Sequence, residues 1–205
     1  MAQYRPVGSR TRWRRARALL ASGLVLGVGA AVTLAAWNDS EHSSASFTAG
    51  QFGIVGAVNG TSFSEHPTQA ATATMTFPAT PMVPGTTSYA LFSVRTINPS
   101  VAGTAQLTAN AGNATGLGQY LTYGVRTITG TTCNATTFGS GTAVVTSGSA
   151  LTTGAPAGTV QALQANSGNQ VNYCFEVKLP AAAPNAAQSQ QLTARWEVVA
   201  TSAQP

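Results

Sequence analysis

The sequence has very little charge. Its 205 residues include ten Lys or Arg and five Asp or Glu, 7% of the chain, against about 25% in an average soluble protein. Six of the ten basic residues lie in the first 17 positions, and beyond residue 36 the bases and acids nearly cancel. Nucleic-acid binding needs a basic surface that displaces counterions from phosphate. We therefore expect no nucleic acid among the partners.

Histidine is equally scarce, and this limits the chemistry that the chain can perform. The only histidines are His42 and His66, each preceded by a glutamate. A zinc peptidase needs closely spaced ligands such as His-Glu-x-x-His, and a serine triad needs a histidine that a folded element orients. Both histidines lie in polar junctions between predicted strands, which favours two solvated loop side chains. We expect no catalytic residue, no metal and no cofactor.

Cysteine is limited to two residues, Cys133 and Cys174. Two thiols without a nearby histidine cannot complete a tetrahedral metal site. An even number of cysteines in an exported domain is typical of a disulfide. We predict that these two cysteines are bonded to each other.

Long hydrophobic runs are absent except near the N-terminus. Residues 18–36 carry no charge, and as a helix they would reach about 28 Å, close to the hydrocarbon thickness of a bilayer. Five arginines between positions 10 and 17 precede the run and predict that the chain after it is exported. The run is rich in Ala and Gly and ends in Leu34-Ala35-Ala36, as at a signal-peptidase site.

Two interpretations of this run remain open, a cleaved signal peptide and a retained transmembrane anchor. We favour cleavage between Ala36 and Trp37. The predicted organisation is a signal peptide over residues 1–36, with a basic leader (1–17) and a hydrophobic segment (18–36), followed by a secreted domain over 37–205. The predicted location is outside the cell or on its surface, with membrane contact only through the N-terminal segment before cleavage.

The rest of the chain reads as short strands separated by Gly, Pro, Ser and Thr, without helical periodicity. For example, Tyr173, Phe175 and Val177 share one face of a strand, while Cys174 lies on the other. The pattern predicts an all-β fold, an antiparallel β-sandwich of jelly-roll or immunoglobulin-like plan. The nine predicted strands are residues 47–54, 71–77, 89–97, 103–109, 119–128, 143–146, 159–163, 171–179 and 192–200.

The junction between the signal region and the domain resembles a known family. Thr33-Leu34-Ala35-Ala36-Trp37-Asn38-Asp39, followed by Ala45-Ser46-Phe47-Thr48-Ala49-Gly50, is similar to the SipW-type signal peptide of TasA/camelysin-like secreted proteins. Two further stretches fit this family, the Pro-Gly turn at residues 82–87 and the closing strand with Trp196.

The resemblance implies a secreted jelly-roll subunit of the cell surface or biofilm matrix, cleaved by a dedicated signal peptidase. Its other partners would be further copies of itself or other matrix and cell-wall components. The resemblance also suggests assembly into fibres, in which a strand carrying Phe47, Gly50, Phe52 and Ile54 adds to the sheet edge of a neighbouring subunit. Pairing of the same strand within its own sandwich is the equally weighted alternative.

Camelysin-like relatives also raise the alternative of a surface metallopeptidase, which would have to use His42 or His66. An adhesion or binding module is a third possibility, because the same fold serves many functions. We predict a structural protein that is not an enzyme.

Overall fold

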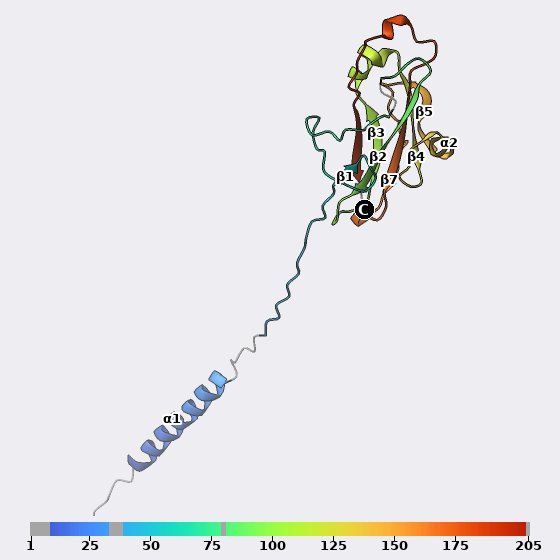
Figure 1. The fold of residues 1–205 in the computed structure, drawn as a ribbon. Coiled ribbons are helices and arrows are strands. Elements are labelled where there is room, and N and C mark those ends of the chain that lie inside the picture. The colour runs from blue at the N-terminus through green and yellow to red at the C-terminus, as the bar shows by residue number, and fades with distance from the viewer. Residues whose placement is uncertain (1–8, 33–38, 79–80, 204–205) are drawn as a thin grey trace, which may run out of the picture. The chain divides into compact units, whose positions relative to one another are not determined.

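The computed structural model describes the backbone of residues 9–32, 39–78 and 81–203. The chain divides into two units, residues 1–47 and 48–205. In the first unit, helix α1 (Ser9–Val32) contains the predicted basic cluster and most of the hydrophobic run (Figure 1). The end of the run, and with it the predicted cleavage site and domain boundary at Ala36 and Trp37, lie outside the described residues.

Among the described residues, no helix combines the length and the apolar character that a membrane span requires. The prediction of a transmembrane helix is therefore not confirmed.

The second unit is mostly β-structure, arranged in two antiparallel sheets, as expected for a β-sandwich. The described strands of the larger sheet are, in spatial order, β1 (Ile54–Ala57), β2 (Thr87–Thr96), β7 (Val171–Lys178), β4 (Thr122–Ile128) and β5 (Thr142–Ala150). Those of the smaller sheet are β6 (Gln161–Leu163), β3 (Gly103–Ala109) and β8 (Trp196–Ser202). All-β structure was predicted, and at this level the prediction is confirmed.

Short helices connect several of these strands, where the sequence predicts only loops and turns. They are α2 (Ala135–Ser140) and the 3-10 turns η1 (Ala111–Ala114), η2 (Gly116–Gln119), η3 (Ala165–Ser167) and η4 (Asn185–Ala187). Asn134 caps the N-terminus of helix α2, because its side chain accepts hydrogen bonds from the backbone N–H groups of Thr136 and Thr137. Such an N-cap stabilises this short helix, although its sequence has no helical periodicity.

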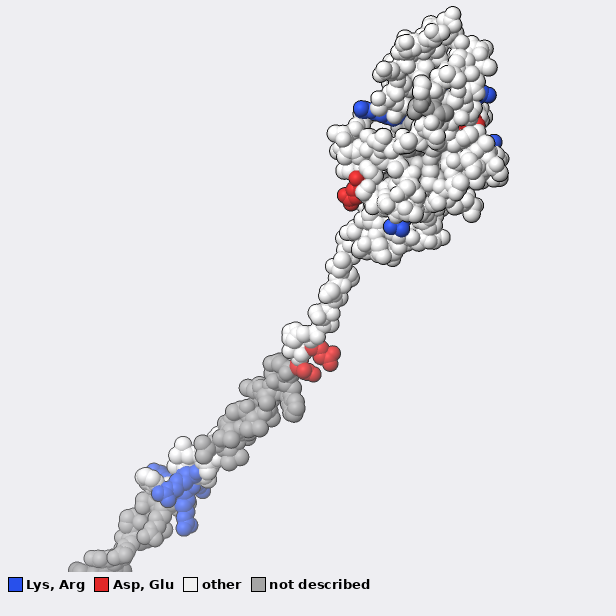
Figure 2. All heavy atoms as spheres, viewed as in Figure 1, with Lys and Arg blue, Asp and Glu red and all other residues white. Residues whose placement is uncertain are grey.

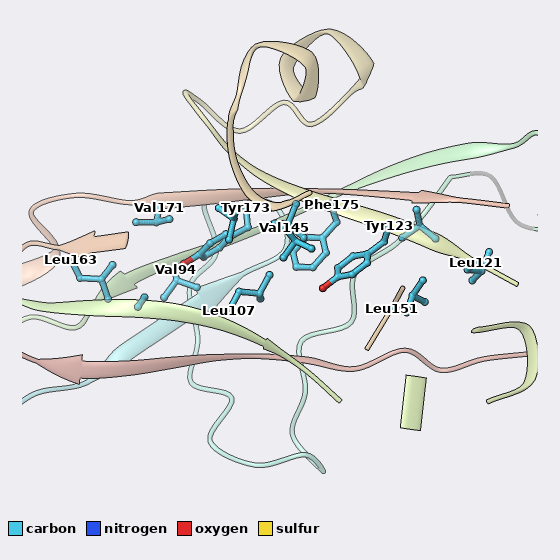
Figure 3. Packing of buried hydrophobic residues seen from close by; sticks show 14 of the residues in the cluster. Val94, Leu107, Leu121, Tyr123, Val145, Leu151, Leu163, Val171, Tyr173 and Phe175 are labelled. Carbon is cyan, nitrogen blue, oxygen red and sulfur yellow. The ribbon is translucent and has the colours of Figure 1, made fainter. Parts of the chain in front are cut away.

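Large alternating side chains fill the space between the two sheets (Figure 3). Tyr123, Tyr173 and Phe175 of the larger sheet are almost fully buried, and Leu107 of β3 meets them from the smaller sheet. The ring centroids of Phe175 and Trp196 lie 5.1 Å apart, in a tilted arrangement favourable for aromatic pairs. The inward faces predicted for these strands are therefore confirmed.

Two predicted strands are wrong: 47–54, of which only Ile54 belongs to a described strand, and 71–77. Residues 71–77 alternate in exposure as predicted, with Ala73, Met75 and Phe77 half-buried and the threonines between them exposed. However, no strand forms there, and residues 72–77 make no backbone hydrogen bond to any described residue. Alternating exposure of side chains indicates an extended backbone next to a core. A strand also needs backbone hydrogen bonds to a neighbouring strand.

Burial of the tyrosines predicts that the domain loses stability at alkaline pH. Burial raises the pKa of Tyr123 to about 12, and it also raises the pKa of Tyr173, whereas a tyrosine in an unfolded chain titrates near 10. Above about pH 10 the unfolded chain therefore releases protons that the folded chain keeps, and the free energy of unfolding falls as pH rises. The slope would reach about 1.4 kcal/mol per pH unit for each buried tyrosine.

Urea unfolding across this range, together with ultraviolet absorbance of tyrosinate, checks the prediction. Tyr123→Phe removes one of the titrating groups, so its stability should fall less steeply with pH. Tyrosinate absorbance from every tyrosine of the still folded domain would contradict the prediction.

Candidate functional site

Residues 39–50, here called the N-terminal segment, form no helix or strand, and all their side chains are exposed. The most prominent is Phe47, which is 93% exposed. Glycine and small polar residues surround it, and the stretch from Ala45 to Gly50 carries no charge. A segment of this kind can add as a strand to the edge of another sheet when it is extended, because main-chain hydrogen bonds supply the affinity of such contacts.

The following residues belong to the sandwich itself. The C=O of Gln51 accepts a hydrogen bond from the N–H of Val101 at 2.9 Å, and the C=O of Gly53 accepts one from Ile97 at 3.0 Å. Ile54 opens β1 and pairs with Thr96 of β2. From Gln51 onward, the chain thus pairs within its own domain.

Packing explains this boundary. Phe52 is half-buried, and its ring lies so close to Gly103 that a Cβ added there would meet the Phe52 Cε2 atom at 2.6 Å. Of the residues predicted for the assembly strand, Phe47 and Gly50 are exposed, whereas Phe52 and Ile54 are half-buried in their own sandwich. The part of the chain that is available for another subunit is therefore residues 39–50, earlier than the range 47–54.

The outer side of β8 offers a matching set of backbone groups. Just beyond its two ends, Ala203 N–H donates to Ala102 C=O at 2.8 Å, and Asn110 N–H donates to Arg195 C=O at 3.2 Å. Hydrogen-bonded pairs alternate along antiparallel strands, so the odd-numbered residues of β8 bond to β3. The even-numbered residues direct their N–H and C=O groups away from β3, and no described strand pairs with them. These groups, called the β8 edge, belong to Trp196, Val198, Ala200 and Ser202.

The other sheet edges are protected. Ser64 forms a backbone bridge to Gly56 on the outer side of β1, with two hydrogen bonds of 3.0 Å. The pairing of β5 with β4 shifts register between Tyr123 and Arg126, and such bulges discourage edge pairing. β6 has only three residues. Within the described residues, β8 is thus the longest regular edge, with seven residues in unbroken register with β3.

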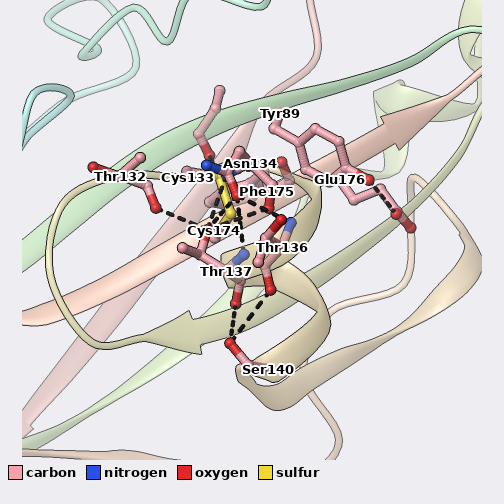
Figure 4. The surroundings of a disulfide bond; sticks show 11 residues. Tyr89, Thr132, Cys133, Asn134, Thr136, Thr137, Ser140, Cys174, Phe175 and Glu176 are labelled. Atoms are coloured by element: carbon pink, nitrogen blue, oxygen red, sulfur yellow. Dashed lines mark hydrogen bonds between the residues drawn. A yellow bond between two sulfur atoms is a disulfide. The ribbon is translucent and has the colours of Figure 1, made fainter.

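The predicted disulfide between Cys133 and Cys174 is confirmed (Figure 4). The fully buried Cys174 lies on β7, between Leu91 of β2 and Arg126 of β4 in register. The bond joins the outer face of the larger sheet to the loop that carries α2. Phe138 of α2 is also buried there, with Arg126 above its ring at 5.1 Å. The disulfide and the buried Phe138 ring thus attach this loop to the sheet.

The histidines on which a metallopeptidase would depend lie in separate segments. His42 is exposed in the N-terminal segment, whereas His66 is half-buried, with its Nε2 atom 3.2 Å from the Ser64 hydroxyl. Among the described residues, no three His, Cys, Asp or Glu side chains lie close enough together to hold a metal ion.

A comparison with protein-family models and with curated proteins finds no match to this chain.

Sequence reasoning missed the β8 edge as a site. The alternation in residues 192–200 indicates a strand but not its position in a sheet, and a free edge is a property of the assembled fold. The signal that was available is composition, because β8 contains no proline or lysine, the residues that commonly protect edges.

Proposed function

We propose that this chain is a secreted structural protein of the cell surface or biofilm matrix. Its subunits assemble when the N-terminal segment of one subunit adds to the β8 edge of the next. The observation that carries the proposal is the presence of both halves of such a contact in one chain, an exposed extended segment and a regular unpaired edge.

Length and charge support this pairing. A seven-residue strand spans about 23 Å, and the twelve residues of the N-terminal segment are enough to follow the whole of β8. The uncharged stretch around Phe47 can lie beside Glu197 without repulsion, whereas Asp39 and Glu41 would remain outside the contact. Few charged side chains are visible on the domain in Figure 2, and such a surface does little to keep neighbouring subunits apart.

We assign the sandwich to the jelly-roll or immunoglobulin-like plans. The chain passes from one sheet to the other after β2, β3, β5, β6 and β7, and β7 lies between β2 and β4, both distant in sequence. Long connections that insert a late strand between earlier ones characterise Greek-key sandwiches.

A backbone variant of the β8 edge tests the assembly. Ala200→Pro removes an N–H that points away from β3 and therefore costs no hydrogen bond within the subunit, and edge strands tolerate proline. We expect the unaltered protein to form fibres in negative-stain images, and the variant to remain monomeric in size-exclusion chromatography with an unchanged fold.

Val199→Ser is the matched control, because it changes an exposed side chain of β8 while leaving every backbone donor in place. Deletion of residues 39–50 should abolish assembly as Ala200→Pro does. Fibres formed by both of these altered chains would refute the proposed contact, as would an unaltered protein that stays monomeric.

Secretion is tested on the same protein. Intact mass and N-terminal sequencing of material from the medium and the cell surface should give a chain that begins at Trp37. A recovered chain that still carries residues 18–36 would refute cleavage at that site.

A further inference from the structure

A polar hollow of about 360 Å³ lies beside the start of β8. The residues that line it include three with carboxamide side chains, two with hydroxyl side chains and one arginine, namely Gln69, Asn110, Gln191, Thr115, Thr193 and Arg195. Arg195 is the only charged residue of this lining, and no carboxylate belongs to it. Glu197, two positions further along the strand, is not part of the lining.

Hydrogen bonds hold both the backbone of Arg195 and the tip of its side chain. Its backbone N–H donates to Asn113 Oδ1 at 2.9 Å, and its C=O accepts from Asn113 Nδ2 at 2.8 Å. At the tip of its side chain, Nη1 donates to Gln69 Oε1 at 3.1 Å. That is the single hydrogen bond that the guanidinium makes within the described part of the chain, so most of its N–H donors remain available to a ligand.

The rim is fixed as well. The Asn110 side chain accepts a hydrogen bond from the N–H of Gly112 at 2.8 Å and so orders the turn η1. The N–H of Leu117 donates to the C=O of Gln191 at 3.2 Å, which joins the two walls of the hollow. Side chains on a rigid rim lose little entropy when a ligand binds.

We propose that this hollow binds a sugar acid, a hexuronate unit of an acidic polysaccharide. A planar guanidinium matches a carboxylate in a bidentate pair. Carboxamides and hydroxyls both donate and accept, and therefore suit the hydroxyl groups of a sugar ring. The volume lies within the usual range of small-molecule sites. One positive charge matches one carboxylate. A single protein molecule is sufficient for this binding, so the proposal does not depend on assembly.

The test is a titration of the full chain with a galacturonate oligomer, in which calorimetry measures the binding. A neutral galactose oligomer of equal length and inorganic phosphate serve as competing ligands. We expect the galacturonate oligomer to bind at least about 10-fold more tightly than the neutral one, and added salt to weaken it. An absence of binding, equal binding of the neutral oligomer, or equally good competition by phosphate would each overturn the proposal.

Variants locate the site. Arg195→Gln should weaken binding at least about 10-fold, and Arg195→Lys should recover only part of it because lysine lacks the planar fork. Lys178→Gln is the matched control, since it removes an exposed cation of β7 that does not line the hollow. The Arg195 side chain is exposed, so both of its variants should melt at the same temperature as the unaltered protein. Binding that Arg195→Gln leaves unchanged, or that Lys178→Gln weakens equally, would refute the assignment.

Discussion

Replacing Cys133 and Cys174 together with alanine is expected to lower the free energy of unfolding by about 4 kcal/mol. The two residues are 41 positions apart, and a loop of that length loses roughly this amount of chain entropy when it is closed in the unfolded state. Urea unfolding of the unaltered and the double-alanine protein measures the difference. Reductant should destabilise the unaltered protein to about the same level and leave the variant unchanged.

The altered protein should nevertheless keep its two sheets. The disulfide lies on the outer face of the larger sheet, whereas the main core lies between the sheets and contains neither cysteine. The loop that carries α2 also has other attachments, because Arg126 donates to the C=O groups of Gly139 and Gly141 at 3.0 and 3.1 Å. Loss of the sandwich signature in circular dichroism, or a stability change below about 1 kcal/mol, would refute this role of the disulfide.

Strands could be predicted from the sequence where the pattern of side chains within one segment indicates which face is buried. In β7, alternation of large apolar and polar residues marks the inward face, and the same alternation places Cys174 on the opposite face. Tyr173 and Phe175 are fully buried, as that pattern requires. The pairing of the disulfide follows from the number of cysteines alone, since two thiols have a single way to pair with each other.

The features that could not be predicted depend on contacts between residues that lie far apart in the sequence. Residues 71–77 have the alternation of a strand, but residues 72–77 bond to no described backbone group. For residues 47–54 the sequence leaves two alternatives equally open, pairing with another subunit and pairing within the same sandwich. The pairing of Ile54 with Thr96 of β2 decides between them at this residue, and it depends on the assembled sheet. The hollow around Arg195 joins residues 69, 110–115 and 191–195, and no pattern within one segment reveals it.

The structural role of Asn113 is the one that is hardest to predict from the sequence. It lies in a run of small polar residues that reads as a turn, but it is buried, with an exposed fraction of 1%. Its amide group donates to the C=O groups of Leu151 and Arg195 at 3.1 and 2.8 Å and accepts from the N–H of Arg195. It therefore connects the turn η1 to the segment after β5 and to the start of β8.

Asn113→Ala is expected to lower the free energy of unfolding by about 3 kcal/mol, because it leaves the C=O of Leu151 and the N–H of Arg195 without their hydrogen-bond partner. Asn110→Ala is the comparison, a neighbouring carboxamide whose exposed bond caps η1 and whose loss should cost about 1 kcal/mol. Urea unfolding of both variants gives the two values. Equal destabilisation by the two variants would show that burial of the Asn113 amide does not set its contribution.

If Asn113→Ala destabilises the protein more than Asn110→Ala does, Asn113→Ala is also expected to affect the two proposed sites. Asn113 holds the backbone of Arg195, which precedes the β8 edge and lines the polar hollow. Asn113→Ala should therefore weaken uronate binding, although among the described residues the Asn113 amide bonds only to backbone groups of the protein itself. This loss would follow from the position of Asn113 at the junction of η1 and β8, where one buried amide fixes the start of the strand and the arginine beside it.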